Sequence, residues 1–75
     1  MTHNRDLREQ VGWLVRRALD EDGLSQRSLA DALGLSRRGL HRKLWGQRDF
    51  LLLELIRAAK FLDRSVGAFI PESAP

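Results

Sequence analysis

The chain has 75 residues, of which 43% are hydrophobic, and a formal net charge of +3. It therefore has enough apolar material for one small domain with a single core. Because it contains no cysteine, neither disulfides nor a cysteine-based zinc site can support the fold. The longest apolar run, residues 50–56, is far shorter than a membrane span, and the charged N-terminus carries no export signal. We expect a cytoplasmic protein.

Positive charge is concentrated in the middle of the sequence. Residues 23–48 hold six basic residues and one acid, Asp31, for a net charge of +5, whereas the remainder carries −2. A basic segment on a mildly acidic body is the electrostatic footprint of a nucleic-acid-binding protein. A solvated helix face produces the same pattern, so the charge distribution alone leaves both interpretations open.

The first helix is expected from a cap at Asn4 to the glycine at position 23. Its apolar residues recur at spacings of three and four and are Leu7, Val11, Leu14, Val15 and Ala18. The helix ends in three acidic residues, a poor match to the negative end of the helix dipole. Trp13 lies off the apolar stripe. We expect it to pack on the last helix, and exposure at a partner surface is the alternative.

Two short helices joined by a tight turn follow. Ser25 is positioned to cap the first, and Gly34 ends it after apolar residues at positions 29, 30 and 33. Ser36 is positioned to cap the second, which is expected over residues 37–45 and ends at Gly46. Two short helices with a glycine-containing turn between them predict a helix-turn-helix arrangement.

The second of these helices has two different faces. At about 100° per residue, Leu40 and Leu44 point one way and predict burial in a core. The residues that point roughly the other way are Arg38, Arg42 and Trp45. The sequence therefore predicts that the leucines fasten this helix to the domain and that its arginines face outward.

The last third of the chain predicts a fourth helix over residues 52–62 and a short fifth over residues 65–70. The residues of the fourth helix expected in the core are Leu52, Leu55, Ile56, Ala59 and Leu62. In the fifth segment Ser65 is a candidate cap, and Pro71 ends the helix. Residues 71–75 are expected to form a flexible tail. The predicted fold is an all-α, compact bundle of about five helices in one domain, residues 1–75, with its core in residues 5–70.

The segment "LSQRSLADALGLSRRGLHRKLWGQ", residues 24–47, resembles the lambda-repressor and Cro-like helix-turn-helix family. Its second helix and turn follow the family pattern without a gap, and Gly46 and "ELIRAAKFL" also match, so the similarity spans residues 7–70. The resemblance implies five helices that bind operator DNA, usually as a dimer. One departure is the start of helix four, where the family prefers Ser or Thr as cap. This chain has Leu51 there, and Asp49 is the alternative cap.

The resemblance also implies roles for individual residues. Gln26 matches a glutamine that touches a DNA phosphate and supports the recognition helix, and Trp45 matches a position near the phosphate backbone. The positions that match base-contacting residues in the major groove are Arg37, Arg38 and Arg42. Arginine reads guanine through O6 and N7, so these residues predict a half-site that contains G·C pairs, although arginine serves phosphates equally well.

Other residues of the basic segment are assigned on their chemistry. The further candidates for contact with the DNA backbone are Ser25, Lys43, Gln47 and Arg48. For the last three, plain solvent exposure is the alternative. His41 either contacts bases or covers the flank of its helix.

These observations predict a transcriptional regulator that binds double-stranded operator DNA, of the Cro or repressor type found in phage and bacteria. A weak homodimer favoured on DNA is expected, through Val66, Phe69 and Ile70 with Trp13, although Phe69 and Ile70 alternatively complete the core. We expect no enzyme activity, cofactor or small-molecule ligand, and no metal, because neither His3 nor His41 has a partner at ligand spacing. The alternative functions are a protein-interaction module of the same fold, as in antitoxins and antirepressors, or one domain of a longer repressor.

Overall fold

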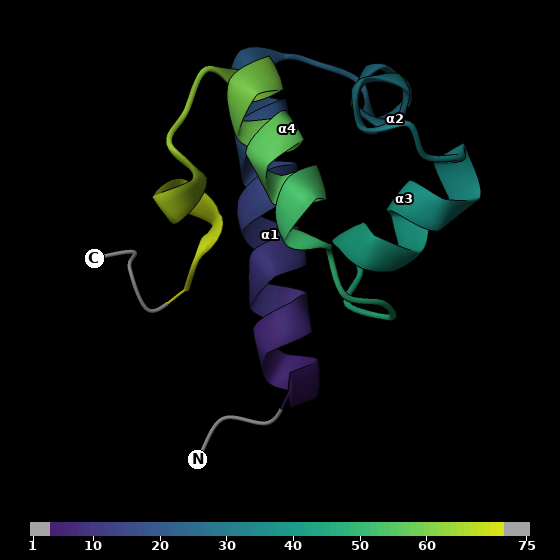
Figure 1. The fold of residues 1–75 in the computed structure, drawn as a ribbon, viewed down its shortest axis with the longest axis vertical. Coiled ribbons are helices and arrows are strands. Elements are labelled where there is room, and N and C mark those ends of the chain that lie inside the picture. The colour runs from purple at the N-terminus through teal and green to yellow at the C-terminus, as the bar shows by residue number, and fades with distance from the viewer. Residues whose placement is uncertain (1–3, 72–75) are drawn as a thin grey trace.

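The computed structural model describes residues 4–71, so the predicted tail, residues 71–75, lies outside this range except for Pro71. Every regular element in that range is a helix, as predicted (Figure 1). The elements are α1 (Asn4–Asp22), α2 (Gln26–Leu33), α3 (Arg37–Leu44), α4 (Leu52–Leu62) and the 3-10 helix η1 (Val66–Phe69). The predicted fifth helix is thus a single short turn, because it holds only four residues between Ser65 and Ile70 and contains a glycine, a poor helix former.

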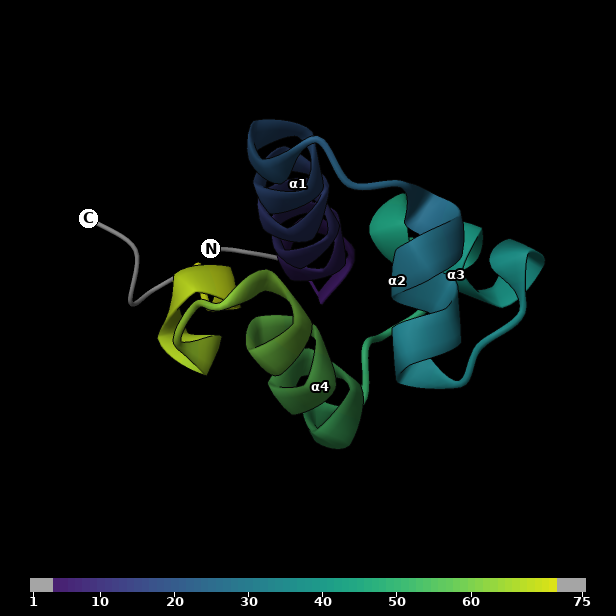
Figure 2. The same cartoon turned by 90° about the horizontal axis from the view of Figure 1, so that it is seen from above.

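The helices surround one core. Helix α1 packs against α3, α4 and η1, and α2 packs against α3 and α4. Figure 2 shows α2 and α3 together on one side of the molecule and η1 on the opposite side. The buried apolar residues are Val15, Ala18, Leu19, Leu29, Ala30, Leu33, Leu40, Leu44, Leu55, Ala58, Ala59, Leu62 and Phe69. None of the described helices combines the length and apolar character that crossing a membrane requires.

The boundaries of α2 and α3 are set by the caps that the sequence predicts. The Ser25 hydroxyl oxygen accepts a hydrogen bond from the backbone N–H of Ser28 at 3.1 Å, and the Ser36 hydroxyl oxygen accepts one from Gly39 at 3.0 Å. Gly34 ends α2 in the left-handed region, with φ of 71°. These interactions join residues that are close in sequence, and they fix the turn between the two helices.

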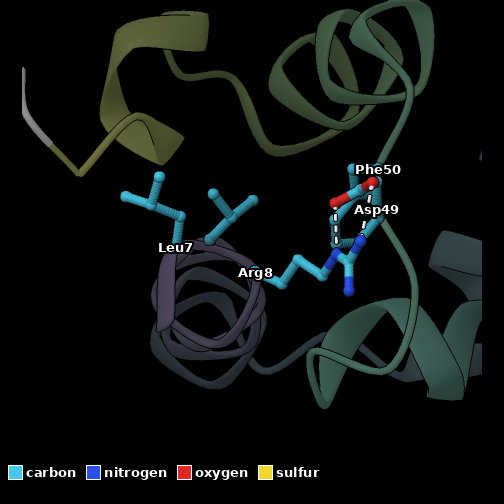
Figure 3. A pocket seen from close by; sticks show the side chains of 5 residues that line it. Leu7, Arg8, Asp49 and Phe50 are labelled. Carbon is cyan, nitrogen blue, oxygen red and sulfur yellow. Dashed lines mark hydrogen bonds and ion pairs between the residues drawn. The ribbon is translucent and has the colours of Figure 1, made fainter. Parts of the chain in front are cut away.

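Helix α4 begins at Leu52, as predicted, with Leu51 as its N-cap. Leu51 has no side-chain acceptor for the first N–H groups of the helix, but its own backbone N–H donates to Glu54 Oε1 at 2.9 Å. Asp49 does not cap the helix, because its carboxylate pairs with Arg8 of α1, with Nε–Oδ1 at 2.6 Å (Figure 3). This hydrogen bond lowers the pKa of Asp49 below its ordinary value.

The buried face of α4 is rotated from the predicted one. Leu52 was predicted to be in the core, but it is 68% exposed, and Ile56 is half-buried. Glu54 and Ala58 are buried instead. The prediction for Leu52 is wrong because the hydrophobic pattern treats a glutamate as outward-facing, and here Lys43 of α3 neutralises the Glu54 carboxylate inside the domain.

The acidic end of α1 acquires a partner from the chain that follows α4. Arg64 donates from Nη1 to Asp22 Oδ2 at 2.9 Å, and its Nη2 lies 3.2 Å from Glu21 Oε1. The hydrogen bond from Arg64 lowers the pKa of Asp22 below its ordinary value. Arg64 thus supplies the positive charge that the last turn of α1 lacks, and it ties the segment before η1 to α1.

Candidate nucleic-acid interface

The helix-turn-helix unit consists of α2, the turn at residues 34–36, and α3. Leu40 and Leu44 are 1% and 0% exposed, as predicted, and they fix the inner face of α3 to the core. Arg37, Arg38 and His41 are all exposed on the rest of this helix. The local pattern of caps and leucines thus suffices to turn the basic face of α3 outward.

A shallow hollow lies between the N-terminal ends of α2 and α3. The residues that line it are Ser25, Gln26, Arg27, Arg37, Arg38 and His41. Five of these were predicted to contact DNA, and the structure brings them together. No acidic residue lines the hollow, and the N-termini of both helices add partial positive charge. This hollow is therefore suited to the phosphates and base edges of a nucleic acid.

Arg27 was missed by sequence reasoning. It is exposed in the first turn of α2, one residue after Gln26, and it lines the same hollow. Its place directly after the predicted phosphate contact was the available signal. Arg42 does not line the hollow and is half-buried, although it was assigned a base contact with equal weight to Arg38.

Lys43 does not belong to the interface. Its Nζ lies 2.5 Å from Glu54 Oε1, and the two side chains are only 12% and 8% exposed. The predicted contact of Lys43 with the DNA backbone is therefore wrong, because the ammonium group is covered and paired. The ion pair instead joins α3 to the first turn of α4, where Glu54 also accepts from the Leu51 N–H.

Trp45 lies at the C-terminal end of α3 and is 46% exposed. The Arg16 guanidinium carbon lies 3.7 Å from the centroid of its ring. Arg16 Nε also donates to the backbone carbonyl of Leu44 at 3.2 Å. The His41 ring lies 5.9 Å from the indole in a tilted arrangement, so His41 both faces the hollow and covers the flank of its helix.

The loop after α3 turns at Gly46 and lies against α1. Gly46 has φ of 74°, and a Cβ there would lie 2.5 Å from Glu9 Cγ and 2.9 Å from the Glu9 backbone nitrogen. Only glycine fits this conformation and this space. The turn carries the exposed side chains of Gln47 and Arg48 past the end of α3, and both remain candidates for contact with the DNA backbone.

The predicted dimer surface is corrected. Phe69 is 1% exposed and belongs to the core, and Val66 and Ile70 are half-buried against it. A dimer contact through Phe69 is excluded in this fold, because its ring fills space inside the domain. Trp13 is 49% exposed, so the expectation that it packs on the last helix is wrong. The Arg17 guanidinium carbon lies 5.3 Å from its ring centroid.

A different apolar surface is open to solvent. Leu51, Leu52 and Leu53 are 61%, 68% and 54% exposed at the start of α4. Beside them in sequence, Phe50 lines a hollow with Leu7 and Val11 of α1, closed on one side by the Arg8–Asp49 pair (Figure 3). Sequence reasoning missed this surface, because it placed Leu52 in the core and gave no surface role to Leu51 or Leu53.

Within residues 4–71, no group of His, Asp and Glu side chains is arranged to hold a metal ion. His3, the second histidine considered as a ligand, lies outside the described residues.

Comparison with known proteins shows that the chain is similar to solved structures. No protein-family model matches the sequence, and no curated protein is significantly similar to it. Among solved structures, the chain is similar to the restriction-modification controller protein C.AhdI from Aeromonas hydrophila, with a TM-score of 0.78 and 28% sequence identity. The match covers 84% of this chain and 96% of that one. The relative is a controller protein, in agreement with the expectation of a regulator rather than an enzyme.

Proposed function

We propose that the chain, whose helix-turn-helix fold is similar to that of a solved controller protein, is a transcriptional regulator that recognises a specific operator in double-stranded DNA. The observation that carries this proposal is the hollow between α2 and α3, where Arg27, Arg37 and Arg38 converge with Gln26 and no acid opposes them. Such a surface attracts the phosphate backbone and presents donors to base edges.

The residues divide into two roles. Arg37 and Arg38, in the first turn of α3, reach base edges in the major groove and favour guanine. Arg42 reads a base beside them, from its half-buried position further along the helix. The contacts that position the domain on the sugar–phosphate backbone come from Ser25, Gln26, Arg27, Trp45, Gln47 and Arg48. This division supports sequence reading by α3 and sequence-independent anchoring by its surroundings.

Regulation follows from occupation of the site. Bound protein at a promoter acts by excluding polymerase, at a level set by its own concentration. The similarity to a restriction-modification controller favours bacterial genes of that kind as targets over a phage operator. The rival function, a protein-interaction module, requires no basic hollow, and this favours DNA.

Two copies are needed to specify a unique genomic binding site, since one small domain reads only a few base pairs. With Phe69 buried, the surface available for pairing is the exposed leucine face, defined as Leu51–Leu53. A face of three partly exposed leucines is small, and two such faces would bury well under the roughly 1,200 Å² of a stable complex. The dimer is therefore weak in solution and favoured where DNA holds both copies.

Selection of bound duplexes from a random DNA pool tests the function. The expected result is an enriched palindrome with G·C pairs in each half-site. Recovery of unselected sequence from repeated rounds, with the protein folded, would contradict recognition of an operator. Selective capture of a protein with no retention of DNA would favour the interaction module.

A further inference from the structure

A second polar site lies outside the helix-turn-helix unit, on α1. Arg16 extends from α1 to the C-terminal end of α3, where its Nε donates to the Leu44 carbonyl at 3.2 Å. Its guanidinium carbon lies 3.7 Å from the centroid of the Trp45 ring. A hydrogen bond and a stacking contact thus hold the guanidinium in one place, whereas Arg27, Arg37 and Arg38 of the candidate interface are exposed.

This arginine opens on a hollow that shares one lining residue with the candidate interface. The residues lining the hollow are Arg16, Leu19, Asp20, Leu24, Gln26 and Trp45. Gln26 also lines the hollow that contains Arg37 and Arg38. A phosphate that contacts Gln26 therefore lies at the edge of the hollow that Arg16 and Trp45 line.

The chemistry of the site suits a phosphodiester. The bond to Leu44 uses Nε, and the terminal nitrogens of a guanidinium can donate in parallel to two oxygens of one phosphate. The indole ring restricts the guanidinium of Arg16, so less side-chain entropy is lost when the anion binds. Asp20 lines the same hollow and opposes an anion, which places the phosphate toward Gln26 and Trp45.

We propose that Arg16, held by the Leu44 carbonyl and the Trp45 ring, binds a backbone phosphate of the operator next to the phosphate at Gln26. This proposal rests on the proposed function, because it assigns one more DNA contact to the same protein. It adds α1 to the interface and gives Trp45 a defined role as the support of a phosphate-binding arginine. Arg16 contributes affinity without sequence preference, since phosphates are the same at every base pair.

The test compares two neighbouring arginines that both lie over a tryptophan. Arg16→Met keeps the aliphatic stem and removes the fork, and Arg17→Met does the same beside Trp13, 5.3 Å from that ring. Affinity for the selected operator and for a scrambled duplex is measured across a salt series. The slope of log K against log[salt] should become shallower by about 1 for Arg16→Met, with roughly three- to tenfold weaker binding to both duplexes. Arg17→Met should match the wild type.

The outcomes separate the phosphate site from a structural role and from failure of the proposed function. An unchanged salt slope in a folded Arg16→Met protein overturns the proposal, as does a loss confined to the operator. If the wild type itself shows no salt-dependent binding to either duplex, the proposed function has failed.

A second variant keeps the test informative if Arg16→Met unfolds. Asp20 is exposed, and Asp20→Asn removes the opposing charge without changing the size of the side chain. It should tighten binding to both duplexes a fewfold at low salt. The matched control Asp31→Asn, on an exposed residue of α2 that does not line this hollow, should change less. Equal effects of the two substitutions would contradict a phosphate beside Arg16.

Discussion

Gly12 of α1 lies directly against the backbone carbonyl of Leu44, the last residue of α3. A Cβ at Gly12 would overlap the Leu44 carbonyl oxygen and lie 2.6 Å from its carbon. The position of α3 relative to α1 therefore depends on a hydrogen atom in place of a side chain at Gly12. The same carbonyl accepts the hydrogen bond from Arg16, so α1 supports the end of α3 through both its backbone and a side chain.

Gly12→Ala should force α1 and α3 apart and destabilise the fold by roughly 1–3 kcal/mol, as overpacking does. Thermal unfolding followed by circular dichroism measures this loss. Gly67→Ala is the matched control, because a Cβ there would meet only the Ser65 hydroxyl oxygen at 3.8 Å. Equal melting temperatures for Gly12→Ala and the wild type would mean that the two helices are further apart than described.

Lys43→Met should lower the free energy of unfolding without removing a DNA contact. It leaves the Glu54 carboxylate buried without its partner, a change that costs roughly 3 kcal/mol in comparable pairs. Lys43→Met combined with Glu54→Met should recover part of this loss. In salt titrations below the melting temperature, the Lys43→Met slope should equal that of the wild type. A slope shallower by about 1 would mean that Lys43 does contact a phosphate of the DNA backbone.

Acid should weaken the fold through Asp22 and Asp49. Hydrogen bonds from Arg64 and Arg8 lower the pKa of these carboxyl groups below the ordinary value of 3.8. Because the folded pKa is the lower one, the stabilisation is complete above the unfolded pKa and is lost as the pH falls through the folded pKa. The melting temperatures of the wild type and Asp22→Asn should therefore differ at neutral pH and converge below about pH 4. A constant difference across this range would contradict the pairing with Arg64.

Leu52→Ser should reduce cooperative binding to a palindrome and leave stability unchanged. Leu52 is 68% exposed, so its loss removes little from the core and much from the exposed leucine face. Binding curves on a full palindrome and on a single half-site measure the effect. Only the affinity for the full palindrome should weaken. Phe69→Ser is the contrasting variant and should unfold the domain, since Phe69 is 1% exposed. Undiminished cooperativity in folded Leu52→Ser would place the pairing surface elsewhere.

The parts of the fold that sequence predicts well are those that depend on neighbouring residues. The caps at Ser25 and Ser36 and the turn at Gly34 each involve residues within about four positions of one another, where residue type and spacing are sufficient. Burial of Leu40 and Leu44 likewise follows from helical periodicity alone.

Several of the features that were missed are pairs between distant segments. The periodicity of α4 cannot reveal that Glu54 is buried, because Lys43 lies on another helix. The stacking of Arg16 on Trp45 joins α1 to α3, and neither residue belongs to a local pattern that indicates the other. For the aromatic residues Trp13 and Phe69, the choice between core and surface depends on how η1 packs against α1, which local pattern leaves open.

The most direct measurement of the central claim is the ratio of affinities for the selected operator and a scrambled duplex at one salt concentration. A sequence-reading regulator should show a ratio of at least about 10³. Arg38→Ala should lower the difference in binding free energy between the two duplexes by roughly 1–3 kcal/mol, mainly through weaker operator binding. The reason is that Arg38 is exposed in the hollow and placed to read a base. Gln26→Ala should weaken both duplexes equally. A wild-type ratio near one, unchanged in Arg38→Ala, would contradict sequence recognition by α3.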